Sequence, residues 1–388
     1  MSELLYFDHA ASAPRRDEVT EAMAPWQHGV VANPSGAHRP AREARRAIEE
    51  ARDVVADFVG AKPAEVIFTA GGTESCQLAL EGVVKAHRRT HEFSEIILSR
   101  VEHHAVIDAA TMLARDYDDV QLRYLEVDHD GVVDLDALRE MISPSTAIVS
   151  VMTANNETGV RQPLDGVNMM AKTTLATDAL THTDAVAGAP WLNLAVVTAS
   201  IDLVSLCAHK LGGPVNAGAL IARNDVALEA MMPGGGQERG RRGGTVDVAA
   251  AVGLAKALEL TKADLARNVE HVLDLQLKLT SALSFLPGCA VSAPGAVKVP
   301  GTVHVTFEGV ASDELLFLLD QEGVAASAAA SCSSGAGEIS HVLSAMGVAH
   351  ERAKGSLRLS MGAETTEVEV ERLIEIVART VYRLRDGG

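Results

Sequence analysis

Residues 65–87 read EVIFTAGGTESCQLALEGVVKAH, and the fold class is decided by this stretch. It begins with a short β-prone run, continues through Gly71 and Gly72, and ends in a helical pattern that reaches His87. This order predicts a strand, a glycine turn and a helix. Backbone N–H groups at the start of such a helix can bind an anion, although many glycine turns before helices bind nothing.

The same alternation continues along the chain. A helix is expected at 41–59, and later strands and helices at 95–99, from 105, at 122–127, at 134–141 and at 147–152. Strands that alternate with helices form βαβ units, in which helices cover both faces of a mostly parallel sheet. The sequence therefore predicts an α/β protein that binds its ligands beyond the carboxyl ends of the strands.

After about residue 253 the pattern changes. Expected there are a helix at 254–285, a strand at 303–307, a helix at 313–321, an Ala/Ser/Gly-rich loop at 325–337 and a last helix at 367–385. This mixture predicts a second, smaller α+β domain. We assign residues 15–255 to the large domain, and residues 1–14 and 256–388 to the small domain, which carries the loop.

Composition narrows the function. The 388 residues are 47% hydrophobic and carry a net charge of −18, which argues against general binding to nucleic acids or membranes. The four cysteines form no CxxC pair and fit neither a zinc site nor a disulfide framework, so no metal site is expected. No signal-peptide pattern and no bilayer-length apolar stretch is found, and we expect a cytoplasmic protein.

Two positions suggest carbonyl chemistry. Lys210 follows an apolar run and precedes a glycine turn, in SLCAHKLGGP (205–214). A lysine at a buried strand end can act as an imine-forming amine, whereas most such lysines are solvated surface charges. Asp184 lies at a possible strand end, where a buried carboxylate needs a partner such as a protonated pyridine ring. A helix cap is the commoner role for an isolated aspartate.

Three further positions carry candidate chemistry. His103, in Glu102-His103-His104, can stack on a flat ring or carry protons, or it is a structural histidine. Cys332 lies in the 325–337 loop, where a thiolate can reach a substrate, although most cysteines are inert. Arg358, in SLRLS, offers a fork for a carboxylate unless it forms a surface salt bridge.

Six motifs together point to a known family: FTAGGTES (68–75), VEHHAV (101–106), NNETG (155–159), AHK (208–210), GGGQERGRRGGT (234–245) and SCSSG (331–335). With these motifs the chain resembles the cysteine desulfurases of the class V aminotransferase group, which are fold type I enzymes that depend on pyridoxal 5'-phosphate (PLP). The resemblance covers nearly the whole chain. It implies a mostly parallel seven-stranded sheet flanked by helices in the large domain.

The resemblance also implies residue roles. Lys210 would hold PLP as an imine, His103 would stack on its ring, and Asp184 would pair with its ring nitrogen. Further cofactor contacts are implied for Gly72, Thr73, Asn155, His209, Thr245 and Cys207, the last standing where the family has a phosphate-binding serine. Because Thr245 matches a residue that reaches the phosphate of the neighbouring subunit, a homodimer is implied.

The implied reaction is the removal of sulfur from L-cysteine. Arg358, assisted by Asn33, would bind the substrate carboxylate, and Lys210 would take the α-proton. The Cys332 thiolate would attack the substrate sulfur and become a persulfide while L-alanine leaves, with His103 relaying protons. An acceptor protein would then take the sulfur: an iron–sulfur scaffold for cluster assembly, a tRNA-thiolation protein or a pathway-specific carrier.

Three departures from the family pattern keep alternatives open. Ala187 replaces a glutamine that bonds the cofactor's phenolic oxygen, Cys207 replaces the serine, and Val215-Asn216 replaces Lys-Gly. Losing one neutral hydrogen bond costs roughly 1 kcal/mol, so cofactor binding should survive. The alternatives are a selenocysteine lyase, a cysteine C–S lyase or an epimerase, and a non-catalytic scaffold, against which Lys210, Asp184 and Cys332 argue.

Overall fold

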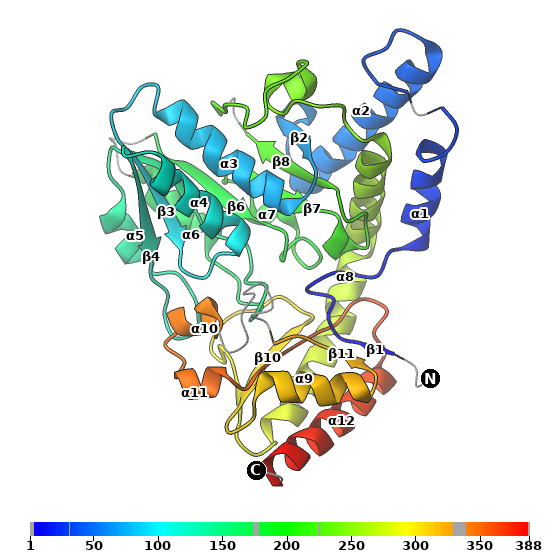
Figure 1. Cartoon of the computed structure of the whole chain (residues 1–388), viewed down its shortest axis with the longest axis vertical. Coiled ribbons are helices and arrows are strands. Elements are labelled where there is room, and N and C mark those ends of the chain that lie inside the picture. The colour runs from blue at the N-terminus through cyan, green and yellow to red at the C-terminus, as the bar shows by residue number, and fades with distance from the viewer. Residues whose placement is uncertain (1–3, 31, 174–177, 224–225, 329–338, 387–388) are drawn as a thin grey trace.

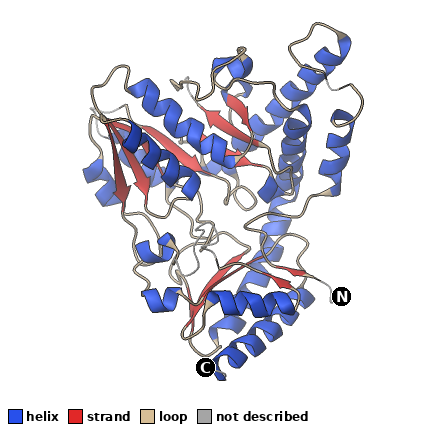
Figure 2. Cartoon of the chain, viewed as in Figure 1, coloured by secondary structure: helices blue, strands red, loops and turns tan. Residues whose placement is uncertain are grey.

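The computed structural model describes residues 4–30, 32–173, 178–223, 226–328 and 339–386. In Figures 1 and 2 an upper body holds the larger sheet and most helices, and a lower body holds a smaller sheet and the last helix.

The large sheet has seven strands in the order β2-β8-β7-β6-β5-β3-β4. Their bounds are β2 (Val66–Thr69), β3 (Ser94–Ser99), β4 (Val120–Leu125), β5 (Thr146–Ser150), β6 (Leu180–Asp184), β7 (Leu203–Cys207) and β8 (Gly218–Ala222). β8 pairs antiparallel with both of its neighbours, and every other pair is parallel. The predicted α/β class and mostly parallel seven-stranded sheet are therefore confirmed.

Helices cover both faces of this sheet (Figure 2). They are α1 (Asp17–Met23), α2 (Arg39–Val59), α3 (Gly72–His87), α4 (His104–Asp116), α5 (Leu135–Met141), α6 (Leu164–Thr173), α7 (Leu194–Val197) and the first part of α8 (Val248–Ser284). Neighbouring strand residues point to opposite faces. Phe68 accordingly packs in one core cluster with residues of α2 and α8, and Ile67 in another with residues of α3 and α4.

The second body is built on a three-stranded antiparallel sheet, in the order β12-β10-β9. It contains β9 (Cys289–Val291), β10 (Thr302–Phe307), β12 (Ser356–Ser360), α9 (Ser312–Gln321), α10 (His341–Ala345), α11 (His350–Ala353) and α12 (Glu367–Asp386). A parallel pair, β1 (Leu5–Tyr6) and β11 (Val324–Ala325), brings the N-terminal segment to this body.

Helix α8 connects the two bodies (Figure 1). Its residues up to Leu258 belong to the core under the large sheet, and those from Val272 belong to the core of the small sheet. The assigned boundary at residue 255 thus falls inside one continuous helix. The division into domains stays a prediction, which the separate cores and the pairing of β1 with β11 support.

Some element bounds differ from those expected. α8 begins at Val248 instead of 254, because the Asp247 side chain caps it by accepting the Ala250 N–H at 3.0 Å. β4 covers 120–125 instead of 122–127, and β5 covers 146–150 instead of 147–152. The hydrogen-bonded register with β3 sets these bounds, and periodicity in one segment does not contain that register.

The seven-stranded and the three-stranded sheet each contain a buried histidine that lies between two serines. His182, on β6, lies 2.7 Å from Ser150 Oγ of β5 and 2.9 Å from Ser205 Oγ of β7. His304, on β10, lies 2.7 Å from Ser292 Oγ and 2.8 Å from Ser356 Oγ of β12. Burial lowers the pKa of His182 to about 4 and that of His304 to about 3, where Arg358 and Lys298 add to the effect.

An ion pair covers the free side of the edge strand β2. Glu238 accepts the N–H of Phe68 at 2.8 Å, and Arg52 donates to the carbonyl of Val66 at 2.9 Å. The two side chains also form a bidentate pair at 2.8 and 2.9 Å, and both residues are buried. Because an uncovered strand edge can pair with another chain, this contact protects the sheet as well as joining α2 to the 237–240 turn.

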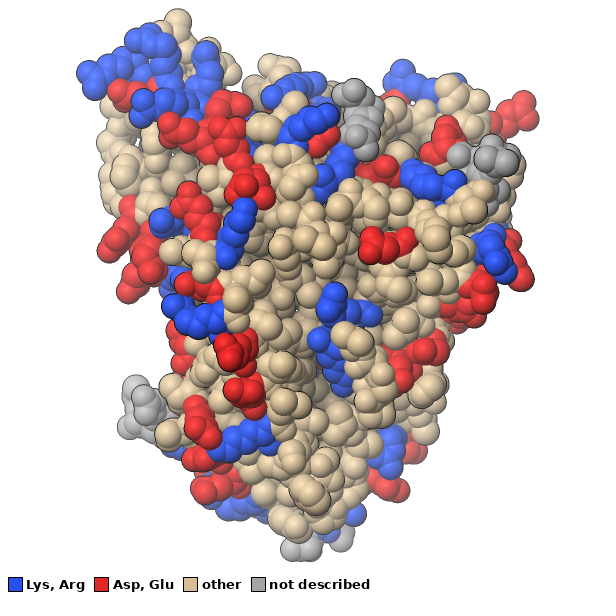
Figure 3. Space-filling view, turned by 180° about the vertical axis from the view of Figure 1, so that it is seen from behind, with Lys and Arg blue, Asp and Glu red and all other residues tan. Residues whose placement is uncertain are grey.

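The surface carries charges of both signs. Figure 3 shows Lys and Arg interspersed with Asp and Glu over the rear face, with a denser basic group at the upper left. On α2, exposed arginines pair with acidic residues one turn further on, as in Arg39–Glu43 and Arg46–Glu50. None of the described helices is long and apolar enough to cross a membrane.

Arg52→Ala should lower the free energy of unfolding by about 3–5 kcal/mol, because it leaves the buried Glu238 carboxylate without its partner. Arg46→Ala, which removes an exposed arginine from the same helix, should change it by less than about 0.5 kcal/mol. Urea unfolding of both variants measures the difference. Equal losses would show that the buried pair contributes no more than the surface pair.

Stability should decrease on acidification below about pH 6.5, the ordinary pKa of histidine. The folded-state pKa values of His182 and His304 lie below it, so the unfolded chain binds more protons as the pH falls toward 4. The stabilisation that the neutral His182 and His304 contribute is complete above pH ~6.5 and is lost as the pH falls below it. Urea unfolding across this range should show a shallower pH dependence for His304→Gln, whose amide bonds serines without titrating. An unchanged slope would contradict this origin.

Candidate active site

Four strands of the large sheet have their carboxyl ends on the same side of it. β2, β3, β6 and β7 run in the same direction, since only β8 opposes them. Asp184 is the last residue of β6 and lies opposite Ser205 of β7 in the register. Lys210 follows the end of β7 in a short 3-10 turn, His209–Leu211. Both candidates therefore reach the edge that the sequence pattern predicted for ligands.

A hollow of about 290 Å³ lies at this edge, close to the lower limit of ~300 Å³ for ligand sites. Seven of the predicted residues line it: Gly72, Thr73, His103, Asp184, His209, Lys210 and Arg358. Ala187 lines it too, so the position of the replaced glutamine is at the site. The structure thus brings together residues from β6, the turn after β7, α3, the start of α4 and the small sheet.

His103 is held in one orientation. It is the N-cap of α4, and its Nδ1 accepts the N–H of Ala105 at 3.0 Å. In the neutral ring the proton is therefore on Nε2. Burial lowers the pKa of His103, and the Lys210 charge lowers it further while Asp184 opposes this shift. The ring is thus neutral near pH 7, and a neutral ring can stack on a flat cofactor or exchange a proton.

Arg358 enters the hollow from the centre of β12. It is 3% exposed and donates to Asp8 at 2.8 Å and to the carbonyl of Asn156 at 3.1 Å. Its Nε has no hydrogen-bond partner among the described residues. A buried guanidinium with a free donor is suited to bind a carboxylate. Arg358 does form a salt bridge, with Asp8, but this arginine is buried and does not lie on the surface as the alternative interpretation of the sequence assumed.

Other residues that line the hollow have groups that suit an anion. Gly71, the N-cap of α3, has no side chain that could accept the first N–H groups of the helix, and Gly72 and Thr73 begin it. His209 has a buried Nδ1 without a partner in the described part of the chain. Burial, with Lys210 and His103, lowers the pKa of His209 to about 4, so the ring is neutral near pH 7 and can donate one N–H.

Cys207 and Asn155 do not line this hollow. Cys207 is buried, its Sγ lies 3.9 Å from His209 Nε2, and burial raises the pKa of its thiol to about 11. The Asn155 side chain holds its own loop: Oδ1 accepts the N–H groups of Glu157 and Thr158, and Nδ2 donates to Val101. The cofactor contacts expected of Cys207 and Asn155 stay predictions.

Asn33 and Thr245 lie together in a different hollow, beside Arg52 and Glu238. Within one chain, therefore, Asn33 does not meet Arg358, and Thr245 does not meet Lys210. Their implied roles stay predictions, and the one for Thr245 refers to a neighbouring subunit. Cys332 lies outside the described residues.

Two acidic residues at the site were not selected from the sequence. Asp8 forms the ion pair with Arg358. The feature of the sequence that could have indicated Asp8 is its position as an isolated carboxylate in the apolar segment LLYFDHAA. Glu102 is fully buried, and its Oε1 accepts the N–H of Met152 at 2.6 Å. Burial raises the pKa of Glu102 well above its ordinary value, and the nearby Asp184 adds to this.

Comparison with known proteins finds relatives that match nearly the whole chain. The profile of the aminotransferase class-V family matches residues 5–373. An IscS-like cysteine desulfurase of Mycobacterium tuberculosis is 39% identical over 98% of this chain and 97% of its own. The cysteine desulfurase IscS of Methanosarcina thermophila is 38% identical over 99% of this chain and 94% of its own. The solved structure of a NifS-like protein is 32% identical, covers 98% of this chain and 100% of that chain, and superposes with a TM-score of 0.91.

These matches extend over nearly the whole chain, and the family profile includes both the strands that form the large sheet and β12, which carries Arg358. On this basis the chain belongs to the class V aminotransferase family.

Proposed function

We propose that this protein is a PLP-dependent cysteine desulfurase, which converts L-cysteine to L-alanine and a persulfide on Cys332. The observation that carries the proposal is the hollow in which Lys210, Asp184 and Arg358 meet from three elements. An amine, a carboxylate and a buried guanidinium are the groups that an amino-acid site with a carbonyl cofactor needs. Both sequence relatives are cysteine desulfurases.

The residues of the hollow fit PLP. The uncapped start of α3 and the unpartnered Nδ1 of His209 suit a phosphate, because both present N–H donors. Asp184 suits the protonated ring nitrogen; its Oδ1 already accepts the N–H of Val186 at 2.9 Å, which fixes the carboxylate. His103 suits the ring face, and Lys210 the aldehyde.

When bound, PLP supplies an electron sink for the charge left on the substrate's α-carbon. The chain's own groups do the remaining work. Lys210 is the amine that takes the α-proton, because it lines the hollow from the turn that follows β7. Asp184 would keep the proton on the ring nitrogen by accepting a hydrogen bond from it.

Arg358 orients the substrate. Its Nε is the free donor, and the Asp8 ion pair holds the guanidinium in place at 2.8 Å. A carboxylate bound there would direct the amino group toward Lys210. Because Arg358 comes from the small sheet and Lys210 from the large one, substrate binding depends on both bodies.

The sulfur step conserves atoms. The Cys332 thiolate forms a bond to the substrate sulfur as the carbon–sulfur bond breaks, and that electron pair and a proton complete the methyl group of alanine. Cys332 keeps the sulfur as a persulfide. His103, neutral and oriented through Nδ1, can move protons between Nε2 and the thiol.

We extend the proposal to assembly and partners. The protein would act as a cytoplasmic homodimer, with Thr245 facing the partner's phosphate group, and Asn33, from the same hollow, near the partner's substrate. It would transfer sulfur to an acceptor protein, such as an iron–sulfur scaffold or a tRNA-thiolation carrier. The clustering of Asn33 and Thr245 away from their own chain's Lys210 supports a shared site.

A second candidate is a related lyase acting on selenocysteine or cysteine. Ala187 favours it, because this small side chain lines the hollow where the family has a glutamine and so changes the contacts available to the cofactor ring. A preference for selenocysteine when both amino acids are assayed side by side would select this candidate.

Lys210→Ala should abolish the absorbance band near the visible edge that borohydride bleaches in the native protein, because no other amine is expected at the aldehyde. Alanine formation should fall by about 100-fold or more with the loss of the base. Lys256→Ala, which removes a lysine on the surface of α8, is the control and should retain both. A full band that borohydride still bleaches in Lys210→Ala would show that another amine holds the cofactor.

Mass spectrometry after exposure to L-cysteine should find one added sulfur atom on Cys332. Cys332→Ala should keep the absorbance band but form no persulfide and little alanine. Cys289→Ala is the matched control, because burial raises the pKa of that thiol to about 11 and makes it a poor nucleophile. Undiminished alanine formation by Cys332→Ala would refute the role of Cys332.

A further inference from the structure

We propose that His87, His91 and Asp178 form a binding site for a divalent transition-metal ion of the zinc type. The site lies at the edge of the large sheet opposite to the active-site hollow. His87 ends α3, His91 is in the turn that leads into β3, and Asp178 precedes β6. Both strands begin at this site. At their other ends, His103 follows β3 and Asp184 is the last residue of β6.

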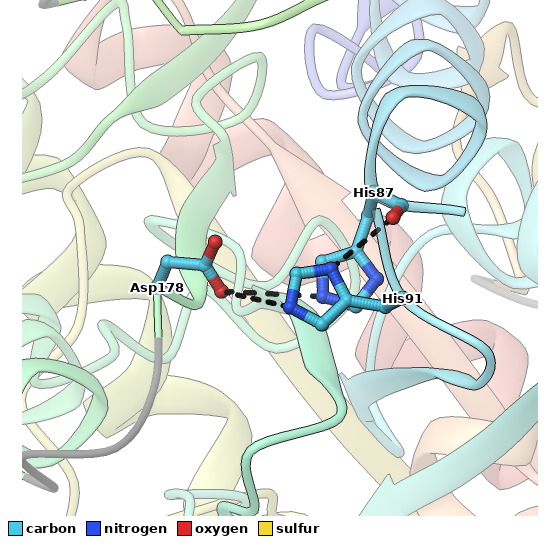
Figure 4. Close-up of side chains that lie close together, drawn as sticks. All are labelled: His87, His91 and Asp178. Atoms are coloured by element: carbon cyan, nitrogen blue, oxygen red, sulfur yellow. Dashed lines mark hydrogen bonds and ion pairs between the residues drawn. The ribbon is translucent and has the colours of Figure 1, made fainter. Parts of the chain in front are cut away.

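The three side chains face one another (Figure 4). The Nε2 atoms of both histidines lie 4.0 Å from the same carboxylate oxygen of Asp178, and all three candidate ligand atoms lie within 4.8 Å of one another. The two rings are stacked, with centroids 3.8 Å apart and planes inclined by 6°. No other group of this kind occurs in the part of the chain that the structure describes.

The outer nitrogens of both rings have the partners that metal-binding histidines usually have. His91 Nδ1 lies 3.2 Å from the backbone carbonyl of His87, which can only accept, and 3.0 Å from Thr90 Oγ1, which can donate or accept. When Nδ1 donates to the carbonyl, the lone pair of the neutral ring is on Nε2. His87 Nδ1 lies 2.8 Å from Ser94 Oγ. Such contacts orient a ligating ring and select its tautomer.

An independent observation indicates a missing partner. The His87 side chain is only 7% exposed, and its Nε2 has no hydrogen-bond partner among the described residues although it points toward Asp178. A buried ring nitrogen without a partner costs free energy.

Neighbouring cations are engaged elsewhere. Arg88 lies between the two histidines in sequence but binds Asp119 at 2.8 Å and lies over the Tyr117 ring. Arg89 pairs with Glu229. The negative charge of Asp178 is therefore available to an incoming metal ion.

Two imidazoles and one carboxylate are ligands typical of Zn²⁺ and similar ions, and are unlike the all-oxygen sites of Mg²⁺ or Ca²⁺. Bonds of 2.0–2.1 Å in a tetrahedron place ligand atoms ~3.3 Å apart, so the 4.0 Å separations must shorten by less than ~1 Å. One of the two stacked rings must also turn, so that the lone pairs of both Nε2 atoms point at the ion. Asp178, which is 71% exposed, has room to move. Three protein ligands leave a fourth position for water.

We assign a structural role to the metal ion at this site. β5 lies between β3 and β6 in the sheet. A metal ion would join the connection before β3 to the segment before β6 across the end of β5. We therefore expect bound metal to raise thermal stability. The inference does not depend on the proposed PLP chemistry.

The test is a titration of the untagged, chelator-treated holoenzyme with Zn²⁺, followed by calorimetry, and with Co²⁺, followed by absorption spectroscopy. One equivalent should bind and raise the melting temperature. His91→Gln and Asp178→Asn should each weaken this binding at least tenfold and abolish the thermal shift. Ser94→Ala should weaken it by about tenfold, because the partner that orients His87 is lost.

His129→Gln is the matched control. His129 is an exposed histidine 3.6 Å from Asp130, a pair that has no second histidine among the described residues. This variant should bind metal as the native protein does. The proposal is overturned if the native protein binds no equivalent of Zn²⁺, if His91→Gln binds it equally well, or if His129→Gln loses binding to the same extent. Melting temperatures measured without metal show whether each variant is folded.

Discussion

The register of the parallel strands is the constraint on which the candidate active site depends. β6 pairs with β7 so that Asp184 stands opposite Ser205, and this places the end of β6 beside the turn that carries Lys210. A shift by one residue would exchange the two faces of the strand and bury the wrong side chains. β7 packs on both faces: Val204 and Leu206 lie in the core cluster with residues of α2 and α8, and Leu203 lies in the cluster with residues of α3 and α4.

Buried polar groups reinforce the register. The two His–Ser clusters each connect three neighbouring segments of a sheet through side chains, in addition to the backbone ladder. His304 also lies opposite Arg358 in the pairing of β10 with β12. Burial lowers the pKa of His209, the neighbour of Lys210 in sequence, and of His304, so both rings are neutral near pH 7.

The carboxyl and amino ends of the strands in the large sheet bring together different sets of side chains. At the carboxyl edge, side chains from both bodies surround one hollow, and α8 holds the bodies together as a single helix. At the amino edge, the connections into β3 and β6 bring two imidazoles to one carboxylate. Because β3 and β6 end near His103 and Asp184, the proposed metal site would stabilise the strands that lead to these two residues.

The sequence by itself determined the βαβ alternation, the change of pattern after residue 253, and the motifs that contain Lys210, Asp184, His103 and Arg358. These features are local, since periodicity and motif spacing need no knowledge of distant residues. The tertiary structure alone decided which of them meet. It placed Asp8 on Arg358 and Asp178 near His87 and His91, and it separated Asn33 from Arg358 within the chain. Contacts between residues far apart in sequence depend on strand order and register, which a single sequence does not encode in any one segment.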